Sequence, residues 1–329
     1  MEREILESLE YELKRLNRTP HGRRVFLASL PFILSACASP KKTRYREGSN
    51  QGQKTSITVD DEKKMANDYM PKMFKDYPLV KDNESQLYLK GIGQEIVRTN
   101  QLNNNPYQYD FYLVESKAVN AFALPAGKIF VTTPLLAMAD TEAELAGVIG
   151  HEIGHVKARH TAERIDYAKK EQGNSWMYAL GGTLAGAGLG YGLSKLICKP
   201  KDKECVERIA KYGAMAGAAG GLLIQKYGFM ANSQEDEMEA DRIGFRTSVT
   251  AGYHKDYVGR FYSKLLEMEK QAKGKQGGML ASFADAMSTH PPSEKRVNQM
   301  NKMANSQNAK AKSKISSKAF EKIRKKYLS

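Results

Sequence analysis

The chain contains only three cysteines in 329 residues, and this scarcity limits what its thiols can do. Cys198 and Cys205 flank the loop 199–204, and no histidine lies near them in the sequence. Two thiols without histidines cannot complete the four ligands of a structural zinc site, which excludes such a site there. In an oxidising compartment a disulfide closing this small ring is the favoured interpretation, worth about 2–3 kcal/mol.

The amino end lacks an apolar run long enough for a permanent membrane-spanning helix. A short apolar segment through Ile33 and Leu34 follows the paired arginines at 23 and 24. Paired arginines after a long polar stretch resemble a twin-arginine export signal. The run ends in Leu34-Ser35-Ala36-Cys37, which resembles a bacterial lipobox. We therefore expect residues 1–36 to be a signal peptide and Cys37 to carry lipid; an uncleaved anchor is the alternative.

The residues after this cysteine indicate where such a lipoprotein resides. Ala38, rather than Asp, follows it, which by the usual enterobacterial sorting rule indicates the outer membrane. Residues 37–57 are mostly polar and are expected to form a flexible tether. The predicted location is the bacterial cell envelope, as a lipoprotein facing the periplasm and attached to the membrane through Cys37.

The sequence has no recognisable nucleic-acid-binding module, despite a formal charge of +14. We therefore expect no nucleic-acid partner. Positive charge is concentrated over residues 301–329. Apolar residues recur there at helical spacing among lysines: Ile315, Ala319, Phe320, Ile323 and Tyr327. This basic amphipathic tail suits an anionic lipid or lipopolysaccharide, and a solvated tail is the alternative.

Residues 176–228 are rich in glycine and alanine. Two apolar stretches there flank the cysteine loop, and lysines interrupt or bound them. We expect a tightly packed helical hairpin that covers the candidate site or touches the membrane surface. A membrane-spanning hairpin is the alternative.

The most informative segment spells HExxH at His151-Glu152-Ile153-Gly154-His155. Thr141 and Glu144 form a capping-box pattern, and apolar residues at helical spacing predict a helix reaching about residue 168. Two histidines four apart project from one face of a helix and can chelate zinc. The intervening glutamate can act as general base on a metal-bound water.

A third histidine at the spacing of the metzincin peptidases is missing. His160 lies five residues after His155 without the required glycine, so it is interpreted as a partner of the ligands or a surface residue. A later helix starting at Ser233 offers carboxylates instead. Spacing alone does not choose among them: Glu235, Asp236, Glu237, Glu239 and Asp241.

Other patterns predict helices over 59–76, 84–99, 255–273 and from residue 293. Residues 107–115 alternate like a strand, and 120–131 predict two strands joined by a tight Pro-Ala-Gly turn. The expected fold class is α+β, mainly α, with a small β-sheet packed by the HExxH helix. No internal repeat is visible.

Four segments together resemble the HtpX-like gluzincin zinc peptidases, metallopeptidase family forty-eight, and most closely their periplasmic BepA/LoiP lipoprotein branch. The segments are the HExxH motif and residues 120–125, 237–241 and 290–292 with Arg296, across roughly residues 58–300. The chain departs from the family in having Ser233-Gln234 for Ser-Arg and Pro125-Ala126-Gly127 for Pro-Gly-Gly. No tetratricopeptide domain follows.

The resemblance implies one zinc ion per chain, with Glu237 as third ligand beside His151 and His155. It places Asp241 next to a ligand histidine, and Arg296 as a residue that orients neighbouring groups or the substrate. His290 is interpreted as the donor to the oxyanion, or alternatively as an inhibitory fourth ligand. Residues expected to bind an extended polypeptide are Asn120, Ala121, Phe122, Ala123 and Leu124, with the strand 128–131 as an alternative edge.

The implied reaction is hydrolysis of internal peptide bonds, in which Glu152 takes a proton from a zinc-activated water and passes it to the leaving amine. Misfolded or misassembled envelope proteins are the expected substrates. Two other functions remain open: a chaperone or assembly factor for outer-membrane proteins with secondary proteolysis, and a structural zinc-binding lipoprotein.

Overall fold

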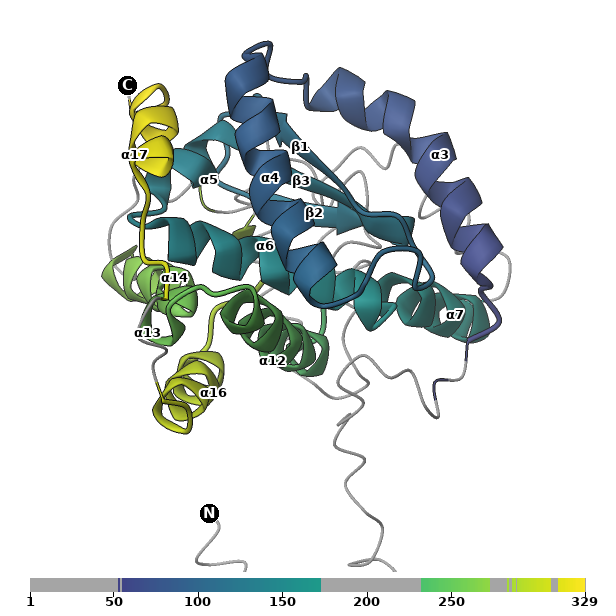
Figure 1. The fold of residues 1–329 in the computed structure, drawn as a ribbon. Helices are drawn as coiled ribbons and strands as arrows, with labels where there is room; N and C mark the ends of the chain where they lie inside the picture. The colour runs from purple at the N-terminus through teal and green to yellow at the C-terminus, as the bar shows by residue number, and fades with distance from the viewer. Residues whose placement is uncertain are drawn as a thin grey trace, which may run out of the picture. The chain divides into compact units, whose positions relative to one another are not determined.

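The computed structural model describes residues 53, 55–172, 232–272, 283, 286, 287, 289–308 and 313–328 (Figure 1). The predicted signal peptide, Cys37, the hairpin 176–228 and the Cys198–Cys205 disulfide all lie outside the described residues. Within the described ranges, no helix combines the length and the apolar character needed to cross a membrane.

A mixed sheet of three strands lies at the centre of the described fold. β1 (Asp110–Val114) runs parallel to β3 (Lys128–Thr132), and β2 (Ala121–Leu124) runs antiparallel to β3 on its other side. The strand order is therefore β1-β3-β2. The predicted tight turn is a short 3-10 turn, η1 (Pro125–Gly127), in which Ala126 and Gly127 both have positive φ. A Cβ on Gly127 would lie 2.8 Å from the carbonyl oxygen of Gln108, which explains the glycine.

The alternating side chains of the strands supply two separate apolar clusters. Phe111, Leu113, Ile129 and Val131 face a core that includes apolar residues of α4 (Asn83–Thr99) and α6 (Glu142–Lys157). The opposite face carries Phe122 and Phe130, stacked with 4.9 Å between ring centroids. It packs against α3 (Val59–Asp76) and α7 (His160–Gln172). Figure 1 shows α3 and α4 on different sides of the strands.

Helices α6 and α12 (Gln234–Thr250) cross in close contact below the sheet (Figure 1). Glycines make this approach possible, because a Cβ on Gly244 would lie 2.6 Å from the backbone nitrogen of His151. A Cβ on Gly154 would similarly lie 2.7 Å from the carbonyl oxygen of Ala240. The predicted helices 59–76, 84–99 and the one starting after Ser233 are confirmed.

The prediction of one helix running to residue 168 is wrong. α6 ends at Lys157, Arg159 adopts a left-handed conformation with φ of 54°, and α7 starts at His160. The predicted helix 255–273 is likewise divided, at Gly259, into α13 (Lys255–Val258) and α14 (Arg260–Ala272). The helix predicted from residue 293 is α16 (Glu294–Asn305), capped by Ser293.

The basic segment after residue 312 packs onto this fold. Its helix α17 (Lys318–Lys325) buries Phe320 and Ile323 in the core that contains α4. On its polar side Lys322 and Lys326 pair with Asp82 and Glu84. The apolar stripe of this basic amphipathic segment is therefore buried within the chain.

Candidate metal centre

Helix α6 places His151 and His155 on one buried face, as the spacing predicts. Their Nε2 atoms are 2.9 Å apart, and both rings are almost fully enclosed. Thr141 caps the helix by accepting a hydrogen bond from the backbone of Glu144. The capping box is only half formed, because the Glu144 carboxylate accepts a bond from the backbone of Asp140 instead.

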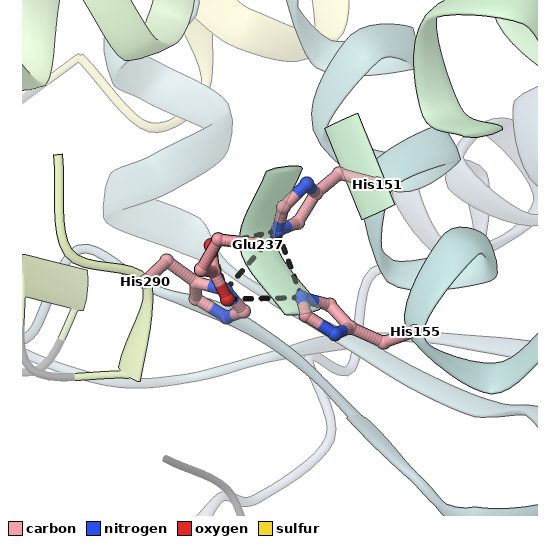
Figure 2. A group of neighbouring side chains, drawn as sticks. All are labelled: His151, His155, Glu237 and His290. Atoms are coloured by element: carbon pink, nitrogen blue, oxygen red, sulfur yellow. Dashed lines mark hydrogen bonds and ion pairs between the residues drawn. The ribbon is translucent and has the colours of Figure 1, made fainter. Parts of the chain in front are cut away.

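Helix α12 brings Glu237 to these two histidines (Figure 2). Its carboxylate oxygens lie 3.2 Å from His151 Nε2 and 3.1 Å from His155 Nε2. Ser233 and Asp236 form a reciprocal capping box that starts the helix. Among the five acids that spacing left open, Glu237 is therefore the one that joins the histidine pair.

His290, in the segment just before α16, is the fourth member of the cluster in Figure 2. Its Nδ1 lies 3.2 Å from His151 Nε2 and 3.2 Å from a Glu237 oxygen. Its Nε2 lies 3.2 Å from the carbonyl oxygen of Ala121 in β2 and 3.4 Å from Glu152. One ring nitrogen thus faces the candidate ligands, and the other faces the edge of the sheet.

The chemistry of this cluster fits a metal ion such as zinc. One ligand atom from each of the four residues lies within 4.8 Å of the others, and all four residues are buried. Burial raises the pKa of Glu237, but Arg296 and the histidines outweigh this and hold it well below its usual value. Burial holds the pKa of His155 well below its usual value, so this ring is neutral. An ionised carboxylate and a neutral imidazole are the forms that bind metal.

His151 differs because carboxylates face both of its nitrogens. Its Nδ1 lies 2.9 Å from Asp241 on α12, one turn after Glu237. Burial lowers the pKa of His151, but Glu237 and Asp241 together raise it to about 9. An N–H on Nδ1 directed at Asp241 leaves Nε2 to face the cluster, which is the arrangement that orients a metal-binding imidazole.

His160 holds the other candidate ligand in the same way. The helix breaks at Arg159, and the Nδ1 of His160 at the start of α7 lies 2.8 Å from the Nδ1 of His155. The far nitrogen of His160 lies 3.4 Å from Glu239. This placement agrees with the prediction that His160 is not a ligand. His160 is buried beside His155, so it is a partner of the candidate ligands and not a surface residue.

Arg296 connects the acidic groups of the centre. Its guanidinium donates two hydrogen bonds of 2.7 Å to Asp241 and lies 2.7 Å from Glu237. It also donates to the carbonyl oxygen of Pro291, next to His290. Arg296 is therefore buried against the residues of the cluster, and its guanidinium does not face solvent.

Glu152 and Asn120 occupy the side of the cluster nearest the sheet. Burial raises the pKa of Glu152, although His290 and His151 oppose this effect. Asn120 precedes β2, is fully buried, and its Nδ2 has no hydrogen-bond partner among the described residues. Residues 121–124 form β2 itself, so all the residues predicted to bind substrate lie at one edge of the sheet.

Two buried residues at the centre were not predicted from the sequence. The amide nitrogen of Asn232 lies 3.3 Å from His155 Nε2. The ring of Tyr262 lies 5.2 Å from the ring of His151, and its hydroxyl has no hydrogen-bond partner within the described part of the chain. Neither residue belongs to a spaced motif, so only the tertiary structure reveals them.

An HExxH helix crossed by a second helix that supplies a glutamate defines the gluzincin class of metallopeptidases. Residues 83–304 match the sequence model of Peptidase family M48. The chain belongs to this family.

The chain is similar to two bacterial proteins, both named beta-barrel assembly-enhancing protease. It is 26% identical to that of Yersinia pestis over 250 residues, which cover 76% of this chain and 45% of the relative. It is 25% identical to that of Escherichia coli (strain K12) over 273 residues, 83% of this chain and 49% of the relative. The chain therefore spans less than half the length of either relative.

A similarity over a shorter part of the chain extends to a eukaryotic protein. The mitochondrial metalloendopeptidase OMA1 of Arabidopsis thaliana is 31% identical over 188 residues, covering 57% of this chain and 30% of the relative. The prediction of membership in metallopeptidase family forty-eight is confirmed.

Proposed function

We propose that the protein is a zinc-dependent endopeptidase that hydrolyses internal peptide bonds of polypeptides. The observation that supports this most directly is the convergence of His151, His155 and Glu237, with ligand atoms within 4.8 Å of one another. Zinc held by these three residues would activate a water molecule and polarise the carbonyl group of the substrate. Asp241 and His160 would hold the two histidines in their ligating orientation.

Glu152 is proposed as the general acid–base. It follows a ligand histidine on α6, is 2% exposed, and burial raises the pKa of its carboxyl group. A raised pKa suits a carboxylate that accepts a proton from the attacking water and donates it to the leaving amine. A structural zinc site would not need this carboxylate.

The edge strand β2 is proposed to bind the substrate backbone. β3 lies between β1 and β2 and pairs with both, which supports β2 rather than the strand 128–131 as the binding edge. Backbone pairing along β2 would hold an extended substrate with little dependence on its sequence. The unpartnered Nδ2 of Asn120 supports this proposal, because a buried donor of this kind fits a substrate carbonyl.

His290 is proposed to act as a fourth ligand in a resting state. Its Nδ1 lies among the ligand atoms, while its Nε2 contacts the carbonyl oxygen of Ala121 on the same edge. A substrate strand pairing with β2 and His290 would compete for that carbonyl. Displacement of His290 would then open both the edge and the fourth ligand position.

Misfolded or misassembled envelope proteins are the proposed substrates. The names of the bacterial relatives and the lipobox-like sequence ending at Cys37 support this. Attachment through lipid on Cys37 would place the peptidase at the outer membrane, facing the periplasm. Mass spectrometry of the mature amino terminus tests the anchor, and an unmodified Cys37 would refute it.

The Glu152→Gln variant tests the reaction and separates it from a binding function. The full-length protein is loaded with zinc and incubated with fluorescein-labelled casein as an unfolded polypeptide. Wild type should cleave it, and Glu152→Gln should bind zinc equally well but lose cleavage. Intact cleavage by the variant would refute the mechanism. A wild type that binds casein without cleaving it would favour the chaperone function.

A further inference from the structure

The side chain of Asn232 is directed into the candidate metal centre from the residue before the cap of α12. It is 5% exposed, and its Nδ2 lies 3.3 Å from His155 Nε2 and 3.5 Å from His290 Nδ1. The sequence contains no spacing or motif that singles it out. Its position nevertheless places an amide group against the atoms that would hold the metal.

The orientation of this amide is fixed by Arg164 on α7. A guanidinium nitrogen of Arg164 donates a hydrogen bond to the Oδ1 of Asn232. A guanidinium has only donors, so the atom facing it must be the oxygen and the nitrogen must face the cluster. The same nitrogen of Arg164 lies 3.5 Å from Asp236, which completes the capping box of α12 with Ser233, and this contact keeps the guanidinium in place.

One hydrogen of the amide is already committed. Nδ2 donates to the carbonyl oxygen of Thr289, 3.2 Å away, beside His290. The second hydrogen faces the ring nitrogens of His155 and His290. Each of these nitrogens has a single lone pair. A nitrogen that gives this lone pair to a metal cannot also accept a hydrogen bond. Among the described residues, the structure records no other acceptor for this hydrogen.

A buried donor without an acceptor costs about 1–3 kcal/mol, so the site has a place for one more oxygen atom. His290 does not supply an equivalent donor here, because its Nε2 is engaged with Ala121 and its Nδ1 lies among the ligands. The amide of Asn232 is neutral and buried. Arg164 bonds to its oxygen, and its nitrogen bonds to the carbonyl oxygen of Thr289. Such preorganised donors are most effective where negative charge develops during a reaction.

We propose that Asn232 is a further catalytic residue, whose side-chain N–H donates a hydrogen bond to the carbonyl oxygen of the scissile peptide as that oxygen gains negative charge. This inference rests on the proposed endopeptidase function. Arg164 is a positioning residue in this arrangement, because it acts by orienting the amide. No proton is transferred by Asn232.

The test uses full-length, zinc-loaded protein with the variants Asn232→Ala and Asn232→Asp. Loss of one such donor should lower kcat by about 10²–10³-fold while KM changes little, because the bond strengthens only in the transition state. Zinc content should stay at the wild-type level, since Asn232 is not a ligand. Asn232→Asp keeps the shape but lacks the N–H, so its kcat should fall at least as far.

A second measurement does not depend on turnover. A peptide phosphonate carries a tetrahedral oxyanion, so its affinity should fall in parallel with kcat, whereas the affinity of a cleaved product peptide should not. Gln234→Ala is the matched control, because its amide lies two residues further on but bonds to Ser293. This control should retain wild-type kcat and phosphonate affinity.

The possible failures are distinguishable. If wild type cleaves casein and both Asn232 variants keep kcat within about threefold, Asn232 is not catalytic, although the proposed function stands. Loss of zinc from Asn232→Asp, the shape-preserving variant, would assign the residue a structural function and overturn the proposal. If zinc-loaded wild type cleaves nothing, the endopeptidase function fails, and the inference fails with it.

Discussion

At the scale of single residues, Arg296 balances the charge of the centre. It lies between Glu237 and Asp241, two fully buried carboxylates separated by one helical turn. Without a cation between them, two buried carboxylates one helical turn apart would repel each other, and their pKa values would rise. Burial alone would raise the pKa of both carboxyl groups, but Arg296 and the neighbouring histidines outweigh it and lower both, which keeps Glu237 available to a metal and Asp241 available to His151.

His160 should contribute to metal affinity without being a ligand. The variant His160→Gln removes the ring that meets His155 Nδ1 at 2.8 Å. Loss of such an orienting partner typically lowers metal affinity by about 10–100-fold. Competition with a chromophoric chelator measures this affinity. The control His254→Gln, at the start of α13, should bind zinc like wild type; equal affinities for both variants would contradict the prediction.

His290→Ala distinguishes the two functions proposed for that histidine. If His290 occupies the fourth ligand position at rest, its removal frees the competent state, and cleavage of casein at saturating zinc should rise several-fold. Zinc affinity should fall at the same time, because one ligand is lost. A fall in kcat of more than about tenfold at full zinc occupancy would instead identify His290 as a donor in the transition state.

At the scale of elements, the centre depends on how closely α6 and α12 cross. The HExxH spacing predicts which residues of α6 share a face, and Ser233 predicts where α12 begins. Neither pattern reveals that Gly150, Gly154 and Gly244 bring the two backbones together. The breaks at Arg159 and Gly259 also escaped prediction, because the apolar pattern continues through both and only tertiary packing selects the local φ.

Gly244→Ala tests the importance of this crossing. The new Cβ would lie 2.6 Å from the backbone nitrogen of His151, so the helices must separate. Overpacking of this kind typically costs about 1–3 kcal/mol, and zinc affinity should fall because Glu237 moves away from the histidines. Gly91→Ala on α4 meets nothing within 4 Å and should be neutral or slightly stabilising. Denaturant unfolding and zinc titration measure both effects; unchanged zinc affinity in Gly244→Ala would contradict the account.

At the scale of the whole molecule, the segment 313–328 joins elements that are distant in sequence. Its backbone bonds to Gly252 and His254 at the end of α12, at 2.8 Å each. It also accepts a bond from the backbone of Ala143 in the first turn of α6. The segment therefore ties together the ends of the two helices that carry the candidate ligands. This role was not predicted from the sequence. The segment lies after the part of the chain that matches the family model, and its lysines suggested contact with an anionic lipid.

Phe320→Ala should show that this segment belongs to the fold. Phe320 is 1% exposed, and truncation of a buried phenylalanine typically costs about 3–5 kcal/mol. The control Leu328→Ala removes a side chain that is 55% exposed and should change stability by less than about 0.5 kcal/mol. Equal free energies of unfolding for the two variants would contradict this packing.

Much of the candidate centre could be predicted because its chemistry resides in short motifs. His151, Glu152 and His155 lie within one helical segment, and the family resemblance placed Glu237, Asp241, His290 and Arg296. Asn232, Tyr262 and Arg164 could not be found in this way. Each comes from a different part of the chain, and each reaches the centre only through the tertiary packing of the helices.

The metal content of two glutamate variants of the full-length protein, measured by elemental analysis, tests most directly whether Glu237 is a zinc ligand. Glu237→Ala removes a buried carboxylate within 3.2 Å of His151, whereas Glu235→Ala changes an exposed residue in the same helical turn. Wild type and Glu235→Ala should each hold one zinc per chain, and Glu237→Ala should have lost it. Full zinc content in Glu237→Ala would contradict this assignment.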